Sequence, residues 1–176
     1  MDEPTFDEAQ FGAQRHKTVT WYDPLAVAAL APTMSGRHFL EAIRDGRFPA
    51  PPIARLMGFA IDEVGDGRVV FRCLPDESLY NPIGLVHGGL VCTLIDTVIG
   101  CSVHSLLDAG VAYTSIDLSV NYLRPVRADG GALVATGVVT KPGRRVAFAN
   151  AEVVDGAGKV VATGSGSVLI MEPRST

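Results

Sequence analysis

The sequence has little cysteine and little charge, and each shortage argues against a class of protein. Its three cysteines, Cys73, Cys92 and Cys101, are odd in number and not closely paired, so neither a disulfide framework nor a thiolate zinc site is expected. Lys and Arg number 15 against 19 Asp and Glu, a net charge of −4, which excludes a broad basic surface for nucleic acid or anionic membrane. The N-terminal residues show no secretion signal, and we expect a cytoplasmic protein.

One apolar segment, residues 83–107, is long enough to raise the question of a membrane span. It contains His87, His104 and, at its centre, Asp96. A charged side chain at the centre of a spanning helix costs about 2.5–3.5 kcal/mol. Because 47% of the 176 residues are hydrophobic, one folded domain can bury the segment. We therefore predict a helix over residues 89–107 inside the protein.

The sequence predicts an N-terminal extension followed by one domain. Residues 1–35 form the extension, with a short helix after Asp23, and residues 36–176 form the domain. Helical spacing predicts a helix over residues 37–45. Three prolines then break the pattern: Pro49, Pro51 and Pro52.

The remaining elements are predicted strands. A glycine-containing turn at residues 65–67 joins a hairpin, and four more strands follow the long helix. The predicted strands cover residues 58–64, 68–74, 115–123, 132–140, 146–154 and 160–170. Short connections imply antiparallel pairing, with the last four strands in a meander. The fold class is α+β, a curved antiparallel sheet around one long helix.

The strand over residues 115–123 alternates between apolar and polar side chains, which predicts a half-buried strand. The apolar side chains, Ile116, Leu118, Val120 and Tyr122, share one face, and the polar ones, Ser115, Asp117, Ser119 and Asn121, share the other.

Asp96 is the only formally charged residue between Leu90 and Leu107. Desolvation disfavours a charged carboxylate, and acids in such surroundings cluster at functional sites. The alternative is an Asp that faces solvent or a subunit contact.

A loop rich in turn formers, residues 81–89, leads into the predicted helix. Backbone N–H groups at a helix N-terminus are unpaired and the helix dipole is positive there, so a developing oxyanion could bind. Asn81 and His87 add side-chain donors; the alternative is a capping Asn and a structural His.

These residues resemble the hot-dog-fold acyl-CoA thioesterases, specifically the phenylacetate-pathway (PaaI-type) group. The resemblance rests on Asn81, the triplet His87-Gly88-Gly89, Asp96 nine residues after the His, and the strand over residues 115–125, and it covers roughly residues 36–170. It implies a long helix wrapped by a curved sheet. It also implies active sites at the interface of paired protomers, a homo-oligomer that is a dimer of dimers, and no cofactor beyond the coenzyme A of the substrate.

The resemblance also implies roles for residues. Asp96 corresponds to the catalytic carboxylate, as base or nucleophile, and the Gly88 N–H to the oxyanion donor, with Asn81 and His87 on the loop of the opposite subunit. Ser115 corresponds to a residue that orients the water, a role that Thr114 could also take. Gly89, Thr97 and Thr114 are further candidates for substrate contacts.

Coenzyme A carries phosphates, and an acidic protein must meet them with a local basic cluster. The candidates are Lys141, Arg144, Arg145, Arg124 and Arg127, with solvated turn charges as the alternative. Aromatic and medium-chain acyl groups both remain open, and the candidate acyl-pocket residues are Thr97, Gly100, Val103, Pro82 and Leu85.

Three other functions are weaker. A non-catalytic acyl-CoA-binding protein would not need Asp96, and a hot-dog dehydratase would place Glu on the helix. A serine hydrolase needs a G-x-S-x-G elbow, which residues 164–167 lack. His104 and Asp108 have no suitably spaced third ligand, and we expect a solvated pair and no metal.

Overall fold

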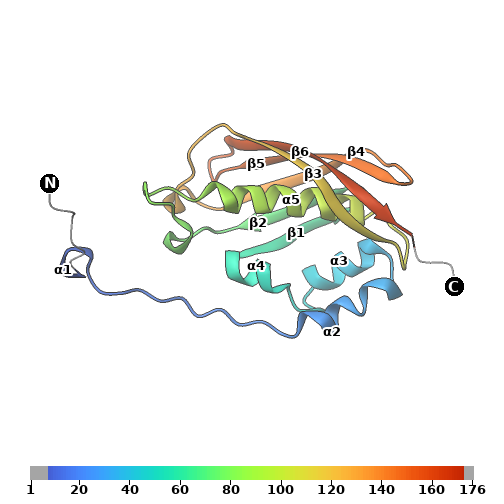
Figure 1. The fold of residues 1–176 in the computed structure, drawn as a ribbon, viewed down its shortest axis with the longest axis horizontal. Coiled ribbons are helices and arrows are strands. Elements are labelled where there is room, and N and C mark those ends of the chain that lie inside the picture. Colours follow the sequence, from blue (N-terminus) through green and yellow to red (C-terminus); the bar gives the residue numbers. More distant parts are fainter. Residues whose placement is uncertain (1–7, 173–176) are drawn as a thin grey trace.

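The computed structural model describes residues 8–172, and its centre is one long helix held by one sheet (Figure 1). The helices are α1 (Glu8–Phe11), α2 (Pro24–Ala28), α3 (Gly36–Arg44), α4 (Pro52–Met57) and α5 (Gly88–His104). The strands are β1 (Phe59–Gly65), β2 (Arg68–Cys73), β3 (Ala112–Tyr122), β4 (Leu133–Lys141), β5 (Val146–Val154) and β6 (Val160–Met171). Short 3-10 turns are η1 (Ala31–Thr33), η2 (Glu77–Leu79) and η3 (Ala128–Gly130). In residues 8–172 no helix meets the length and hydropathy that a membrane crossing requires.

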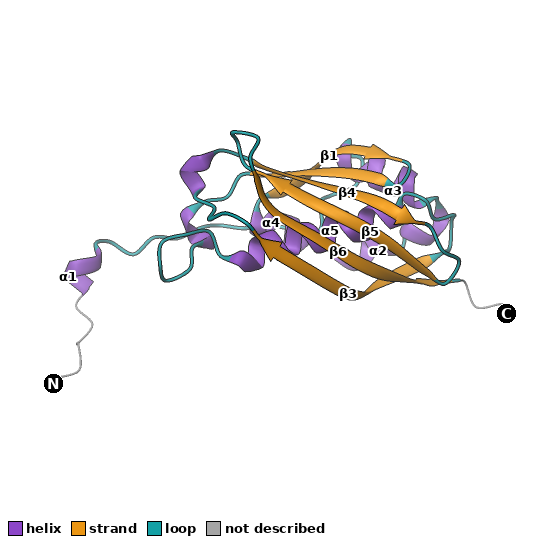
Figure 2. Ribbon diagram, turned by 90° about the horizontal axis from the view of Figure 1, so that it is seen from above, coloured by secondary structure: helices purple, strands orange, loops and turns teal. Residues whose placement is uncertain are grey.

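The six strands form one antiparallel sheet in the order β1-β2-β4-β5-β6-β3, with helices α2 to α5 on one face (Figure 2). The predicted meander is therefore wrong at its first strand, because β3 pairs with β6 and β4 pairs with β2. Residues 123–132 join β3 to β4. A segment of that length can reach about 33 Å, more than the roughly 14 Å that separates strands three positions apart.

The core lies between α5 and the concave face of the sheet. Leu94, Ile95, Val98 and Ile99 on α5 are at most 1% exposed. The backbones approach closely at Gly137 on β4, where an added Cβ would lie 2.2 Å from the carbonyl oxygen of Val98. A glycine is therefore required where the helix crosses this strand.

Strand β3 forms one edge of the sheet, and a β-bulge changes which of its side chains face α5. The pairing with β6 shifts register between Ser115 and Asp117, leaving Ile116 as the extra residue. Strict alternation predicted Ser115 on the polar face with Asp117. The bulge instead places Ser115 on the helix-facing side, together with Leu118. Burial is also lower than predicted, since Ile116 is 53% and Tyr122 55% exposed.

The N-terminal region contains both expected and unexpected helices. Asp23 caps α2, as predicted, and Ser35 caps α3. Helix α4 was not predicted, because its prolines were interpreted as breakers. Pro52 occupies the first helical turn, where its missing N–H costs nothing.

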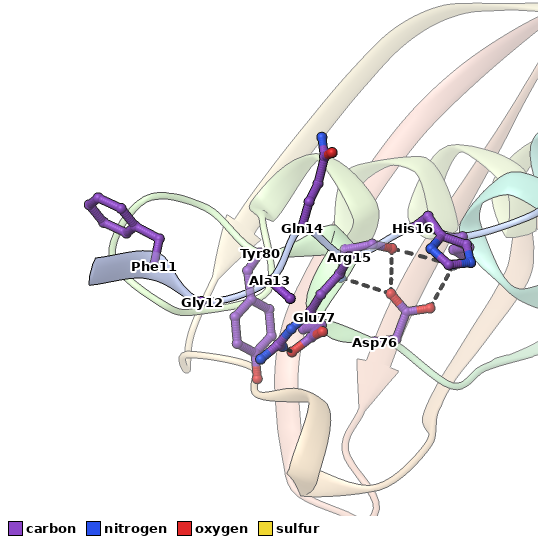
Figure 3. Close-up of a pocket in the computed structure, with 11 residues that line it drawn as sticks. Phe11, Gly12, Ala13, Gln14, Arg15, His16, Asp76, Glu77 and Tyr80 are labelled. Atoms are coloured by element: carbon purple, nitrogen blue, oxygen red, sulfur yellow. Dashed lines mark hydrogen bonds and ion pairs between the residues drawn. The ribbon is translucent and has the colours of Figure 1, made fainter. Parts of the chain in front are cut away.

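An extended arm, residues 12–22, carries α1 away from the sheet (Figure 1). The arm is attached near η2, where Lys17 Nζ lies 2.6 Å from Asp76 Oδ2 and Arg15 pairs with Glu77. Figure 3 shows the cavity of about 900 Å³ between this arm and Tyr80, with Arg15 reaching across to Glu77.

Candidate active site

Asp96 lies half-buried in the middle of α5, beside the bulge of β3. The Ser115 hydroxyl donates a hydrogen bond of 2.8 Å to Asp96 Oδ1. Within the described residues, Oδ2 has no hydrogen-bond partner. The bulge is the cause of this pairing, because without it Ser115 would lie on the far face of the sheet. The structure thus provides a carboxylate with one oxygen held and the other available.

A neutral polar cluster lies one to two helical turns beyond Asp96. Burial raises the pKa of Cys101 to about 12 and lowers that of His104 to about 4. The pKa of Tyr113 also lies well above its ordinary value, mainly because of burial. The rings of His104 and Tyr113 stack with centroids 4.9 Å apart. All three side chains are therefore uncharged near pH 7, and the predicted solvated pair of His104 and Asp108 is wrong, because the imidazole is packed against aromatic rings.

Asn81 organises the loop that precedes α5. Its Oδ1 accepts hydrogen bonds of 3.1 Å from the backbone N–H groups of Ile83 and Leu85. The turn passes through Gly84 with φ of 77°, a left-handed conformation that favours glycine. Among the described residues Nδ2 makes no hydrogen bond, so this amide is available as a donor. Asn81 therefore has a structural role in the loop, and its side-chain amide can still donate a hydrogen bond.

His87 caps the N-terminus of α5. Its Nδ1 accepts a hydrogen bond of 2.8 Å from the Gly89 N–H. Nδ1 is therefore the unprotonated nitrogen of the neutral ring, and the proton sits on Nε2. The neighbouring Gly88 N–H donates to no acceptor in residues 8–172. One backbone donor at the positive end of the helix is left free.

A cavity of about 320 Å³ opens at this end of α5. It is lined by Asn81, Leu85, Gly88, Tyr122 and Arg124, among others. The Tyr122 hydroxyl donates to the Gly88 carbonyl, 3.1 Å away, and an Arg124 Nη1–H donates to the Val160 carbonyl, 2.6 Å away. Tyr122 was predicted only as an apolar side chain of the strand. Its position two residues before Arg124, a predicted substrate-binding residue, is the sequence feature that could have placed it in this site.

The two groups of predicted site residues are separated within one chain. Gly88 and Asp96 lie eight residues apart on α5, and a rise of 1.5 Å per residue puts them about 12 Å apart along the helix axis. A single thioester carbonyl cannot contact both at that distance. The structure therefore brings Asn81, His87 and Gly88 together at one place, and Asp96 and Ser115 together at another.

The remaining predicted residues are dispersed. Thr114 lies on the outer face of β3, since it neighbours the inward-facing Ser115, so Thr114 does not reach Asp96. Thr97 is half-buried on α5, and the Gly89 N–H is occupied by His87. Three exposed basic side chains form no ion pair among the described residues: Lys141 at the end of β4, and Arg144 and Arg145 on the turn that follows. Arg127 pairs instead with Asp129.

The predicted acyl pocket combines residues of the helix with residues of a second copy, so the single chain shows only where each of these residues lies. Val103 is 1% exposed and belongs to the core between α5 and the sheet. Tyr113 covers Gly100, where an added Cβ would lie 3.1 Å from the ring. Of the five residues predicted for this pocket, only Leu85 lines the cavity beside Gly88. The burial of Val103 against the sheet was not predicted, because helix periodicity does not show which side of an apolar helix faces the sheet.

Comparisons with known proteins agree on one class. Residues 83–162 match the thioesterase superfamily. Acyl-coenzyme A thioesterase 13 of Homo sapiens is 30% identical over 136 residues, which cover 75% of this chain and 91% of the human protein. The structure of the Escherichia coli PaaI protein from the phenylacetic acid degradation operon has a TM-score of 0.69 at 24% identity, covering 79% of this chain and 98% of that chain.

A coenzyme A-bound structure belongs to the same group of similar folds. It is a hypothetical thioesterase of Streptococcus pneumoniae, with a TM-score of 0.60 and 27% identity, covering 67% of this chain and 92% of that chain. The curved antiparallel sheet around one long helix is the hot-dog fold, and the thioesterase class rests on the family match and the human relative. The chain belongs to the thioesterase superfamily.

Proposed function

We propose that this protein hydrolyses acyl-CoA thioesters to the free acid and coenzyme A, at a site shared by two copies of the chain. The observation that carries the proposal is the arrangement along α5. A carboxylate held by Ser115 lies in the middle of the helix, and a free N–H lies at its start. The named activity of the human relative and the ligand of the Streptococcus pneumoniae structure support the same substrate class.

The chemistry requires an activated oxygen and a cradle for the carbonyl. Asp96 Oδ2 takes the proton from a water that attacks the thioester carbon, or attacks that carbon itself; Ser115 holds the other oxygen in place. The Gly88 N–H, at the positive end of α5, stabilises the negative charge that develops on the carbonyl oxygen. Collapse of the tetrahedral intermediate breaks the C–S bond. When Asp96 acts as base, its carboxyl group returns the proton to the thiolate; when Asp96 acts as nucleophile, a water then hydrolyses the acyl-Asp96 anhydride to the free acid and the carboxylate, and the thiolate takes a proton from that water. Losing one oxyanion donor typically costs about 2.7–4 kcal/mol.

The separation of Gly88 from Asp96 is the reason for a second copy. One edge of β3 is unpaired in the described chain, and Ile116 on it is 53% exposed. Antiparallel pairing of two β3 edges about a two-fold axis continues the sheet across both copies. The two α5 helices then run side by side in opposite directions, which brings Gly88 of one copy toward Asp96 of the other. Association of such dimers into a tetramer stays a prediction.

Arg124 is the best placed candidate for a phosphate of coenzyme A. It lines the cavity that contains Gly88, and it is exposed. Lys141 ends β4, and Arg144 and Arg145 lie on the turn that follows; none of the three forms an ion pair among the described residues. A long ligand bound across two copies could contact them as well. Aromatic and medium-chain acyl groups remain the two classes to compare.

The test is thiol release from a panel of aryl-CoA and alkyl-CoA esters, comparing the parent with Asp96→Asn. Removing a catalytic acid or base typically lowers the rate by about 10²–10⁴-fold. The matched control is Asp117→Asn, which makes the same chemical change on the outer face of β3, where the side chain is exposed. We expect the parent and the control to hydrolyse esters and Asp96→Asn to lose most activity. Saturable binding of CoA esters with no turnover by the parent would contradict the proposal and indicate a binding protein.

A further inference from the structure

Strand β3 places a tyrosine against the first turn of α5. The Tyr122 hydroxyl donates to the Gly88 carbonyl oxygen, 3.1 Å away. The ring lies so close to Gly88 that an added Cβ would be 3.2 Å from Cε1 and Cζ. The contact therefore combines a hydrogen bond with close packing on the helix backbone, and it depends on the absence of a side chain at position 88.

The peptide group between Gly88 and Gly89 is held at both ends. Its carbonyl accepts the bond from Tyr122, and its N–H donates to His87 Nδ1 at 2.8 Å. These two contacts come from opposite sides of the first turn, one from β3 and one from the cap residue. The adjoining peptide, between His87 and Gly88, carries the N–H that has no acceptor among the described residues.

Such a clamp is needed because α5 begins with two successive glycines. Glycine has the largest conformational freedom of any residue, and the first turn of a helix lacks half of its backbone hydrogen bonds. Without external contacts, this turn would sample several orientations of the Gly88 N–H. A donor that must meet a developing oxyanion has to be fixed in direction before the reaction.

We infer that Tyr122 is a positioning residue for the reaction: together with His87 it clamps the Gly88–Gly89 peptide and so keeps the Gly88 N–H directed at the substrate carbonyl oxygen. This inference rests on the proposed function. Tyr122 acts through the helix backbone, and its hydroxyl is committed to the Gly88 carbonyl. Desolvation and the neighbouring Cys92 thiol raise the pKa of Tyr122, so the phenol stays protonated and keeps its donor at neutral pH.

The first test is Tyr122→Phe, which keeps the ring and removes only the hydroxyl. The variant loses one neutral hydrogen bond, and we expect kcat to fall about three- to tenfold, KM to stay unchanged and the thermal midpoint to fall by only a few degrees. The matched control is Tyr113→Phe, because Tyr113 lies on the same face of β3 and packs on Gly100 of α5 in the same way. Its hydroxyl pairs with the Cys101 thiol instead of the helix backbone, and we expect kcat within about twofold of the parent.

The second test asks whether Tyr122 and His87 act through the same peptide. If they do, Tyr122→Phe and His87→Ala have non-additive effects, and the double variant loses less kcat than the product of the two single losses. Multiplicative losses, or an unchanged kcat in Tyr122→Phe, would overturn the inference. These outcomes are distinct from failure of the proposed function, in which the parent itself releases no thiol.

Discussion

Replacing Ser115 with alanine tests the link between the bulge of β3 and the chemistry of Asp96. The hydroxyl donates at 2.8 Å to Oδ1 and is the only hydrogen-bond partner of this carboxylate within the described residues. Hydrogen bonds to charged groups contribute about 1.5–3 kcal/mol. Ser115 is exposed and Asp96 half-buried in the single chain, so the lower end of that range applies.

A loss of about 1.5 kcal/mol in transition-state stabilisation corresponds to roughly a tenfold decrease in kcat/KM. The assay is steady-state thiol release with the best ester of the panel, together with a thermal melt, which should barely change because Ser115 packs in no core. The decrease should be much smaller than that of Asp96→Asn, since the carboxylate itself remains.

Thr114→Val is the matched control for this prediction. It removes the adjacent hydroxyl, which the bulge leaves on the outer face of the sheet. We expect activity close to that of the parent. A decrease in Thr114→Val combined with full activity in Ser115→Ala would refute the register of β3 and, with it, the assignment of Ser115.

Two further predictions concern stability. His104 has a pKa of about 4 in the folded chain against an ordinary value of 6.5, because it is buried. Between pH 6.5 and 4 the unfolded chain therefore binds a proton at His104 that the folded chain does not bind, and the free energy of unfolding should decrease by up to about 3 kcal/mol over this range. Urea unfolding at several pH values measures this decrease, and His104→Phe should lack the part that comes from His104. An equal pH dependence of the free energy of unfolding in both proteins would contradict the prediction. Gly137→Ala should destabilise the fold by about 1–3 kcal/mol through overpacking against the Val98 carbonyl, and an unchanged urea midpoint would show that the helix can move away.

Local patterns predicted the elements well because their signals are local. Residues 146–154 form a strand with the predicted bounds, and the glycine turn at residues 65–67 joins β1 to β2. The apolar run after the His-Gly-Gly triplet forms α5, which begins one residue and ends three residues before the predicted bounds. The curved sheet around this helix also follows from the resemblance.

Features that depend on contacts between distant segments were missed. The pairing of β3 with β6 depends on the course of a ten-residue connection, which has no period to read. The bulge at Ile116 was hidden because residues 115–122 alternate perfectly in sequence. The clamp by Tyr122 joins residues 34 positions apart. These are also the features that bring Ser115 to Asp96 and fix the Gly88 peptide.

The site residues likewise divide into those that the sequence alone identified and those that needed further information. Asp96 could be singled out from the residues alone, because a lone acid in an apolar helix is unusual. The oxyanion role of Gly88 came from its place at a helix N-terminus and from the resemblance. The resemblance already implied a site shared by two copies, and the structure adds the physical reason, because about 12 Å of helix separates the two residues on one straight α5.

The most direct test of the shared site is complementation between two inactive variants. Asp96→Asn removes the carboxylate. Gly88→Pro removes the donor N–H at the first helical position, where the backbone accepts proline, and its ring also displaces Tyr122, which an added Cβ meets at 3.2 Å. In a random mixture of the two, half of the dimers are mixed and each mixed dimer has one intact site, so unfolding and refolding the variants together should restore about a quarter of the parent activity. The account predicts this recovery for the mixture and almost no activity for either variant alone. A mixture that forms mixed dimers but stays inactive would contradict a site built from two copies.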